Sequence, residues 1–340
     1  MNTLSEADDN ATCMTMCPEA EIRFRESRCL IHPLESSDQT ASTSSSKSRR
    51  ADHSRMVKVY SRPAAGRDDV NPSQLRPFPV LKRTVSYLLR LANESTASWT
   101  LVYEFVADRL RAIRQDMIIQ RMNPLHTLEL LEAMIPFYFI AEYRCESRHC
   151  PGYDRKLHST QLEECLCRWK EVFLLIGSSS DISLCYLLRN ADKTETYQDY
   201  TEWKTQLPPR LRSVVGDAIQ ALKMNNFCRF LRIVGRLPTA ALRCSAWHHI
   251  STNRLAGLTS VSTAFKSPTV KIEVDVIMRW LAFDAEDDAT CCLNELGFRV
   301  NNGTVNFHQK WQEPKPDLHL FHWKRCDKLL DLNADHLFSE

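Results

Sequence analysis

The sequence predicts a mainly α-helical protein, in which stacked helical hairpins of the α-solenoid kind are followed by a winged helix with a small β-hairpin. Glycine is scarce, with 8 residues in 340, where average usage would give about 24. Apolar residues recur at helical spacing from residue 79 to residue 296. Beyond them, two short alternating runs flank Asn302-Gly303, a residue pair that favours a two-residue hairpin turn.

The shortage of glycine also excludes classes of enzyme. Glycine provides the positive-φ turns and close backbone approaches of loops that bind phosphates. The chain contains no G-x-G, no GxxxxGK[ST] and no G-x-S-x-G. Rossmann, P-loop and α/β-hydrolase folds therefore lack their defining motifs here. Since no protease signature surrounds any cysteine either, we expect neither an enzyme nor a bound cofactor.

Residues 1–35 are expected to form an N-terminal motif, and residues 36–56 a serine-rich insert. The stretch 36–50 holds 7 serines and no large apolar residue. It cannot bury enough surface to offset chain entropy, so we expect disorder. Its basic end, Lys47 to Arg50, suits a nuclear localisation signal or a solvated loop.

The helical pattern organises residues 57–245 into one helical domain. Asn123-Pro124 is a start signal, because asparagine caps helices and proline suits the first turn. Pro136 should kink or end that helix. Apolar faces this short need neighbours on both sides, which predicts stacked hairpins. The stripes lie at 81–92, 102–117, 128–135, 162–176, 211–222 and 227–234.

The pattern changes after residue 245. Three further helical segments are expected at 252–265, 274–283 and 285–296. Three helices followed by a hairpin is the plan of a winged helix, which we place at 246–312. Residues 313–340 are expected to be a C-terminal tail without a clear apolar period.

The 13 cysteines form no regular framework, and no apolar N-terminal segment resembles a signal peptide. We therefore expect reduced thiols and a nuclear or cytoplasmic protein. The longest apolar stretch, Ile135 to Ala141, is far shorter than the ~20 residues of a membrane span, so no membrane partner is predicted.

Two groups of cysteine and histidine raise the question of zinc. The groups are Cys13, Cys17, Cys29 and His32, and then Cys145, His149, Cys150 and His158. Zinc motifs usually show tighter paired spacings, and a chain this rich in both residues forms such groups by chance. Reduced thiols in core positions are the simpler interpretation, and no metal site is predicted.

A basic segment is hidden in a chain whose net charge is only +2. Residues 204–243 carry eight basic side chains against one acid, Asp217. This excess suits the phosphate backbone of RNA, and equally a solvated face or a surface for an acidic protein. The basic residues are Lys204, Arg210, Arg212, Lys223, Arg229, Arg232, Arg236 and Arg243.

The third helix of the predicted winged helix has the opposite charge. A helix that enters the major groove normally brings arginine or lysine to phosphates and base edges. Residues 285–296 carry no base, and their acids are Glu286, Asp287, Asp288 and Glu295. We therefore predict no sequence-specific DNA binding. Contact with protein is expected, or contact with a nucleic-acid backbone through the wing residues Arg299, His308 and Lys310.

The run from Tyr103 to Asp116 is dense in charge. Arg111 and Arg114 can share a helix face, Asp108 lies one turn before Arg111, and Asp116 can pair with a neighbouring helix. One interpretation is a set of ion pairs that lock the helix into a stack, and the other is a binding surface. Composition favours the ion pairs.

Several separate motifs, in order, resemble the Sac-three/GANP family. The N-terminal motif contains Cys13, Cys17, Pro18 and Glu19, and Arg76-Pro77 follows the insert. Residues 221–237 are similar to a PCI-type passage from a helical stack to its winged helix. The resemblance covers residues 11–310 and implies a TPR-like, PCI-type α-solenoid. The most specific block, 102–116, includes Asp108, Arg109, Arg111, Arg114, Gln115 and Asp116.

The resemblance implies a non-enzymatic scaffold. In the large export scaffolds of the family, this domain pairs with a second PCI-type protein and a small acidic subunit, and joined winged helices help to hold RNA. The chain shows no Phe-Gly repeats before the domain and no long partner-binding helix after it. In this it resembles the small single-domain animal member of the family.

That small member is linked to centrosome duplication and mitotic spindle assembly. The resemblance thus implies a protein of the nucleus and cytoplasm, with centrosome or spindle association in mitosis. The alternative is an RNA-associated subunit of a TREX-two-like nuclear mRNA export complex.

Overall fold

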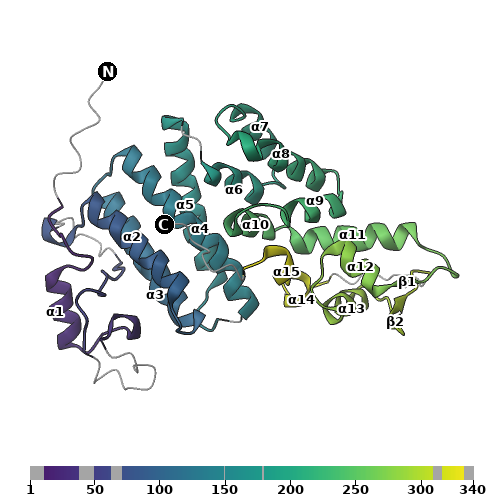
Figure 1. The fold of residues 1–340 in the computed structure, drawn as a ribbon, viewed down its shortest axis with the longest axis horizontal. Helices are drawn as coiled ribbons and strands as arrows, with labels where there is room; N and C mark the ends of the chain where they lie inside the picture. The colour runs from purple at the N-terminus through teal and green to yellow at the C-terminus, as the bar shows by residue number, and fades with distance from the viewer. Residues whose placement is uncertain are drawn as a thin grey trace. The chain divides into compact units, whose positions relative to one another are not determined.

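The computed structural model describes residues 11–37, 50–62, 71–148, 150–177, 180–308 and 316–332. As predicted, the described chain is mainly helical and has a small antiparallel sheet (Figure 1). Its contacts divide it into two compact units. The first ends at residue 177, and the second begins with residue 180 and also takes in residues 146–148. The boundary between the two units lies inside the range 57–245, which the sequence predicts to be one helical domain. The predicted domain boundaries remain predictions.

The first unit contains five helices of the described chain, the fourth of them up to Cys145. They are α1 (Glu19–Ser27), α2 (Phe78–Glu94), α3 (Trp99–Ile119), α4 (Pro124–Arg148) and α5 (Arg155–Ile176). Helices α2 and α3 pack side by side (Figure 1). The predicted stripe of α2, including Leu81, Val85 and Leu88, is buried. Short 3-10 turns at Pro33–Glu35 and Pro72–Gln74 shape the segments before α2.

Helix α4 corrects the expectation for Pro136. The proline lies inside the helix, which continues to Arg148 instead of ending there. An interior proline costs roughly 3 kcal/mol. The neighbouring side chains Ile135, Phe137 and Phe139 are all fully buried. A fully buried side chain of this kind contributes about 1.5–3 kcal/mol, so packing offsets the proline.

The second unit begins with a group of short helices. They are α6 (Asp181–Arg189), α7 (Glu195–Glu202), α8 (Pro209–Lys223), α9 (Phe227–Val234) and α10 (Ala240–Trp247). Helix α6 packs against α8 and α10, and α8 packs against α9. Side chains of Ser180, Asn226 and Thr239 cap α6, α9 and α10, which supplies acceptors for otherwise unpaired N–H groups.

The predicted winged helix is present in the second unit. Its elements are α11 (Ile250–Ala264), β1 (Ile272–Glu273), α12 (Val274–Leu281), α13 (Glu286–Glu295), β2 (Val300–Asn301) and β3 (Thr304–Val305). The strand order is β1-β3-β2, all antiparallel. Asn302 and Gly303 have φ of 49° and 69°, and positive φ at both central residues is what a type I′ turn requires. Strand β1 was not predicted.

The described part of the C-terminal tail, residues 316–332, is packed, which the sequence pattern does not show. It contains α14 (Phe321–Lys324) and α15 (Asp327–Leu330). Trp323, Cys326 and Leu330 are buried, and Trp323 joins the core of the winged helix. Two helices of four residues are too short to display a helical period.

The serine-rich insert differs from expectation at both ends. Ser36 forms a β-bridge with Ala51, the Asp52 N–H donates to the Glu35 carbonyl at 2.8 Å, and Met56 is buried. Residues 36–37 and 50–56 are therefore ordered. Residues 38–49, with most of the basic run from Lys47, lie outside the described residues. Within the described ranges, no helix is long and apolar enough to cross a membrane.

Candidate functional site

The acidic end of the 102–116 block forms a buried ion-pair centre. Asp116 on α3 is fully buried and accepts hydrogen bonds from Arg76 Nε at 2.7 Å and from Lys58 Nζ at 2.6 Å. A carboxylate without water needs such partners to remain charged. Both partners come from segments without regular secondary structure, whereas the sequence predicted a partner on a neighbouring helix.

A second buried carboxylate, Glu35, ties the N-terminal motif to α3. Its two oxygens accept from Arg25 and from Arg109 Nη2, the latter at 3.3 Å. The N–H of Val57 also donates to Glu35 Oε1 at 3.0 Å. Three segments that are distant in sequence therefore meet at one buried charge.

Along its length, α3 holds the segment 57–61 of its own chain. The Tyr60 N–H donates to Asp108 Oδ2 at 3.2 Å, and Asp108 also pairs with Arg109 Nη1 at 2.6 Å. The Arg111 guanidinium lies 3.8 Å from the Tyr60 ring centre. Gln115 Nε2 donates to the Ser61 carbonyl at 2.8 Å. These contacts favour the ion-pair interpretation of the block over a binding surface.

Arg114 has a different set of partners from Arg111. Its Nη1 donates to the side chain of Gln161 on α5 at 2.6 Å, and its Nη2 pairs with Glu164. The two arginines therefore bind separate segments instead of forming a joint surface.

The rest of the N-terminal motif is also structural. The Cys13 N–H donates to the Leu75 carbonyl at 3.0 Å, and Cys17 is buried in a small apolar cluster. Pro18 and Pro77 sit at the N-caps of α1 and α2. Glu19 forms an exposed ion pair with Arg23 at 3.0 Å.

The structure does not assemble the first cysteine and histidine group. Cys13 and Cys17 are buried and Cys29 is exposed, while His32 Nδ1 accepts the Leu34 N–H at 3.2 Å. Burial raises the pKa of the Cys17 thiol and so disfavours the thiolate that metals bind. Among the described residues, no cluster of three or more His, Cys, Asp or Glu side chains is placed to hold a metal ion.

In the second group, His158 bridges aromatic residues in the core. Its Nε2 donates to the Tyr138 carbonyl at 3.0 Å, so its Nδ1 accepts from the Tyr103 hydroxyl at 3.1 Å. Cys145 and Cys150 are buried, and His149 lies outside the described residues.

The structure separates the eight basic residues of 204–243 into structural and exposed groups. Arg243 is buried and donates to the carbonyls of Leu237 at 2.7 Å and Leu330 at 2.6 Å, so it does not belong to a surface. Arg212 is half-buried and donates to the Leu207 carbonyl at 3.0 Å. Lys223 is exposed, and its Nζ donates to the Asp192 carbonyl at 2.5 Å.

Three of the exposed cations lie on α9 and just after it. Arg229, Arg232 and Arg236 recur at helical spacing on the side opposite the buried Phe230 and Val234; we call these three the basic ridge. Arg229 pairs with Asp217 at 3.1 Å. Among the described residues, the side chains of Arg232 and Arg236 have no hydrogen-bond or ion-pair partner, and neither have the exposed side chains of Arg210 and Lys204.

Two acids of α13 contact other side chains of the protein, and two are exposed to solvent. Glu295 accepts from Trp323 Nε1 at 2.7 Å and contacts His322 Nε2 at 2.8 Å, and Asp288 lies 3.8 Å from Arg325. Burial raises the pKa of Asp288. Glu286 and Asp287 remain exposed in the first turn. On the wing, Arg299 and His308 are exposed, and Lys310 lies outside the described residues.

A buried arginine that the sequence patterns miss fastens the C-terminal segment to the winged helix. Arg254 on α11 is fully buried and donates to the carbonyls of Leu281, Trp323 and Arg325 at 3.0, 3.0 and 2.8 Å. Burial lowers its pKa. Nothing in its local sequence marks it, because its acceptors lie up to 71 residues away.

The described chain is a mainly helical protein that ends in a winged helix, and it carries exposed charge of opposite sign on α9 and α13. The chain belongs to the SAC3/GANP family, whose model matches residues 16–302.

Three curated relatives are each 25% identical to the chain. Protein xmas of Drosophila melanogaster aligns over 85% of this chain and 14% of its own length. SAC3 family protein B of Arabidopsis thaliana aligns over 96% and 20%, and SAC3 family protein 1 of Schizosaccharomyces pombe over 90% and 32%. The chain thus spans at most about a third of the length of these relatives.

Proposed function

We propose that this chain is a non-enzymatic scaffold that acts through protein contacts in centrosome duplication and mitotic spindle assembly. The observation that supports this most directly is the charge of α13, where Glu286 and Asp287 are exposed and no base is present. A winged helix with this surface repels a nucleic-acid backbone and suits a protein partner with basic side chains. The cellular setting comes from the family resemblance.

Affinity purification of the tagged full chain through mitosis tests the protein-contact role. The double variant Glu286→Lys with Asp287→Lys reverses the charge of α13, and it should no longer recover partner proteins that wild type recovers. The matched control is Glu195→Lys with Glu202→Lys, two exposed acids on α7. Imaging tests the setting: a signal confined to the nuclear rim, with no centrosomal or spindle pool, would overturn it.

The second candidate function is an RNA-associated subunit of a nuclear mRNA export complex. The basic ridge supports it, because Arg232 and Arg236 are exposed and have no partner among the described residues. Recovery of a second PCI-type protein and a small acidic subunit would favour this setting over the centrosome.

The RNA role predicts a specific salt dependence. Arg229→Glu, Arg232→Glu and Arg236→Glu together should weaken binding of single-stranded RNA and reduce the slope of log K against log salt by about 2, since each phosphate contact contributes about 0.7. The control reverses Arg23, Lys82 and Arg168, three exposed bases in the first unit. Absence of RNA binding by wild type, with its PCI-type partner present, would exclude this role.

A further inference from the structure

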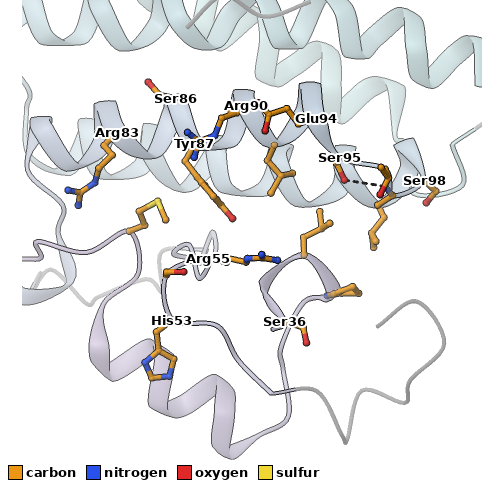
Figure 2. A pocket seen from close by; sticks show the side chains of 18 of the residues that line it. Ser36, His53, Arg55, Arg83, Ser86, Tyr87, Arg90, Glu94, Ser95 and Ser98 are labelled. Carbon is orange, nitrogen blue, oxygen red and sulfur yellow. Dashed lines mark hydrogen bonds between the residues drawn. The ribbon is translucent and has the colours of Figure 1, made fainter. Parts of the chain in front are cut away.

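A large polar cavity lies in the first unit, between α2 and the N-terminal segments (Figure 2). Its volume is about 1380 Å³, which exceeds the roughly 300–1,000 Å³ of usual small-molecule sites and is large enough for an extended peptide segment. None of the ion pairs around Asp116 lines it.

One wall of the cavity is a single face of α2. Arg83, Tyr87, Arg90 and Glu94 follow one another at spacings of four, three and four residues, so their side chains lie on one side of the helix. Arg83 Nη2 donates to the Met14 carbonyl at 2.9 Å, which leaves its remaining N–H groups free to bind. Arg90 is exposed and has no partner among the described residues.

The opposite wall adds a third arginine. Arg55 forms a partly exposed ion pair with Asp52 at 3.1 Å, and Tyr87 projects from α2 toward the segment that carries it (Figure 2). The Tyr87 hydroxyl has no hydrogen-bond partner among the described residues. Burial raises the pKa of Tyr87 to about 12, so the hydroxyl keeps its proton and can donate.

The lining combines the positive charge of the arginines with apolar surface. Three arginines line the cavity against one lining acid, Glu94, and the lining His53 contacts Glu26 at 2.9 Å. Arginine forks and hydroxyl donors match carboxylate and phosphate oxygens. The apolar side chains that line the cavity include Met16, Leu34, Leu91 and Leu101.

We propose that this cavity binds an extended peptide segment of a partner protein, in which an anionic side chain lies between apolar residues. The anion, phosphoserine or carboxylate, contacts Arg90, Arg55 and the Tyr87 hydroxyl, while the flanking residues pack on the apolar lining. The inference rests on the scaffold role but adds a site in the first unit, whereas the basic ridge and α13 lie in the second.

Fluorescence polarisation with a matched peptide panel on the full chain tests this. Peptides of one leucine-flanked sequence carry phosphoserine, glutamate or serine at the centre. The phosphoserine or glutamate peptide should bind at least about tenfold more tightly than the serine peptide, the contribution of one charged hydrogen bond. Comparison of the phosphoserine peptide with the glutamate peptide identifies the anion that the cavity prefers.

Variants then locate the binding. Arg90→Ala should weaken the anionic peptides about tenfold and leave the serine peptide unchanged, and Tyr87→Phe should weaken them a few-fold. Arg168→Ala, an exposed arginine on α5, is the control. No binding, equal binding of all three peptides, or no loss in Arg90→Ala would overturn the proposal. The charge-reversal variants of α13 (Glu286 and Asp287) and of the basic ridge should bind these peptides like wild type. This result would distinguish the cavity from the surfaces of the proposed function.

Discussion

Asp116 and Arg109 of the 102–116 block form buried ion pairs with Arg76 and Glu35, which lie earlier in the chain. Asp116 and Arg76 are both fully inaccessible to solvent, and Glu35 is buried between two arginines. By contrast, the ion pair of Glu19 with Arg23, also at a family-motif position, is exposed. Buried pairs are far more sensitive to loss of one partner than exposed pairs, because the remaining charge keeps its desolvation penalty.

Removal of one partner of Asp116 should therefore destabilise the fold strongly. We expect Asp116→Leu to lower the free energy of unfolding by about 3–5 kcal/mol, since Arg76 is left buried and unpaired. The double variant Arg76→Met with Asp116→Leu should be less destabilised than the sum of the singles. Urea denaturation measures all three, and Glu19→Ala, expected to change stability by less than about 1 kcal/mol, is the control. Additive single effects would contradict this account.

At the scale of elements, hydrophobic period and turn chemistry predict the long helices and the wing. The stripe at 81–92 became α2, and Asn302-Gly303 forms the turn with positive φ at both residues. The patterns miss α6, α7 and α10, whose eight or nine residues show little more than two turns of period. They also miss β1, because its two residues become a strand only by pairing with β3.

The approach of α11 to α9 and α12 depends on one glycine. A Cβ at Gly257 would lie 2.4 Å from Leu281 Cδ2 and 3.1 Å from Phe227 Cγ. Gly257→Val should lower the free energy of unfolding by about 1–3 kcal/mol through overpacking, although valine has the higher helix propensity. Ser260→Ala, on the exposed side of α11, should stay within about 0.5 kcal/mol. A Gly257→Val protein as stable as wild type would show that the helices can separate.

At the scale of the whole molecule, the burial of each cysteine thiol shows how the chain is packed. All 13 cysteines are free thiols, and nine of them are buried. Burial raises the pKa of Cys165 to about 11, so this thiol stays protonated and unreactive at neutral pH. The exposed thiols are Cys29, Cys167 and Cys291.

Alkylation with N-ethylmaleimide at pH 7, followed by mass spectrometry, checks this packing. The native protein should react rapidly at the three exposed cysteines, more slowly at the half-buried Cys228, and elsewhere only after denaturation. Guanidinium chloride should expose all 13 thiols and serves as the control. Rapid native labelling of Cys17 or Cys292 would show that the corresponding core is open.

The sequence by itself determined the helical class, the winged helix, its hairpin turn and the family, because period, turn chemistry and motif order are local properties of the chain. Only the tertiary structure decided what each charged residue does. Arg236 and Arg243 belong to the same basic segment, yet Arg236 is exposed and Arg243 is buried against the carbonyls of Leu237 and Leu330. Leu330 lies 87 residues from Arg243, and no local pattern records which distant segment will remove a side chain from water.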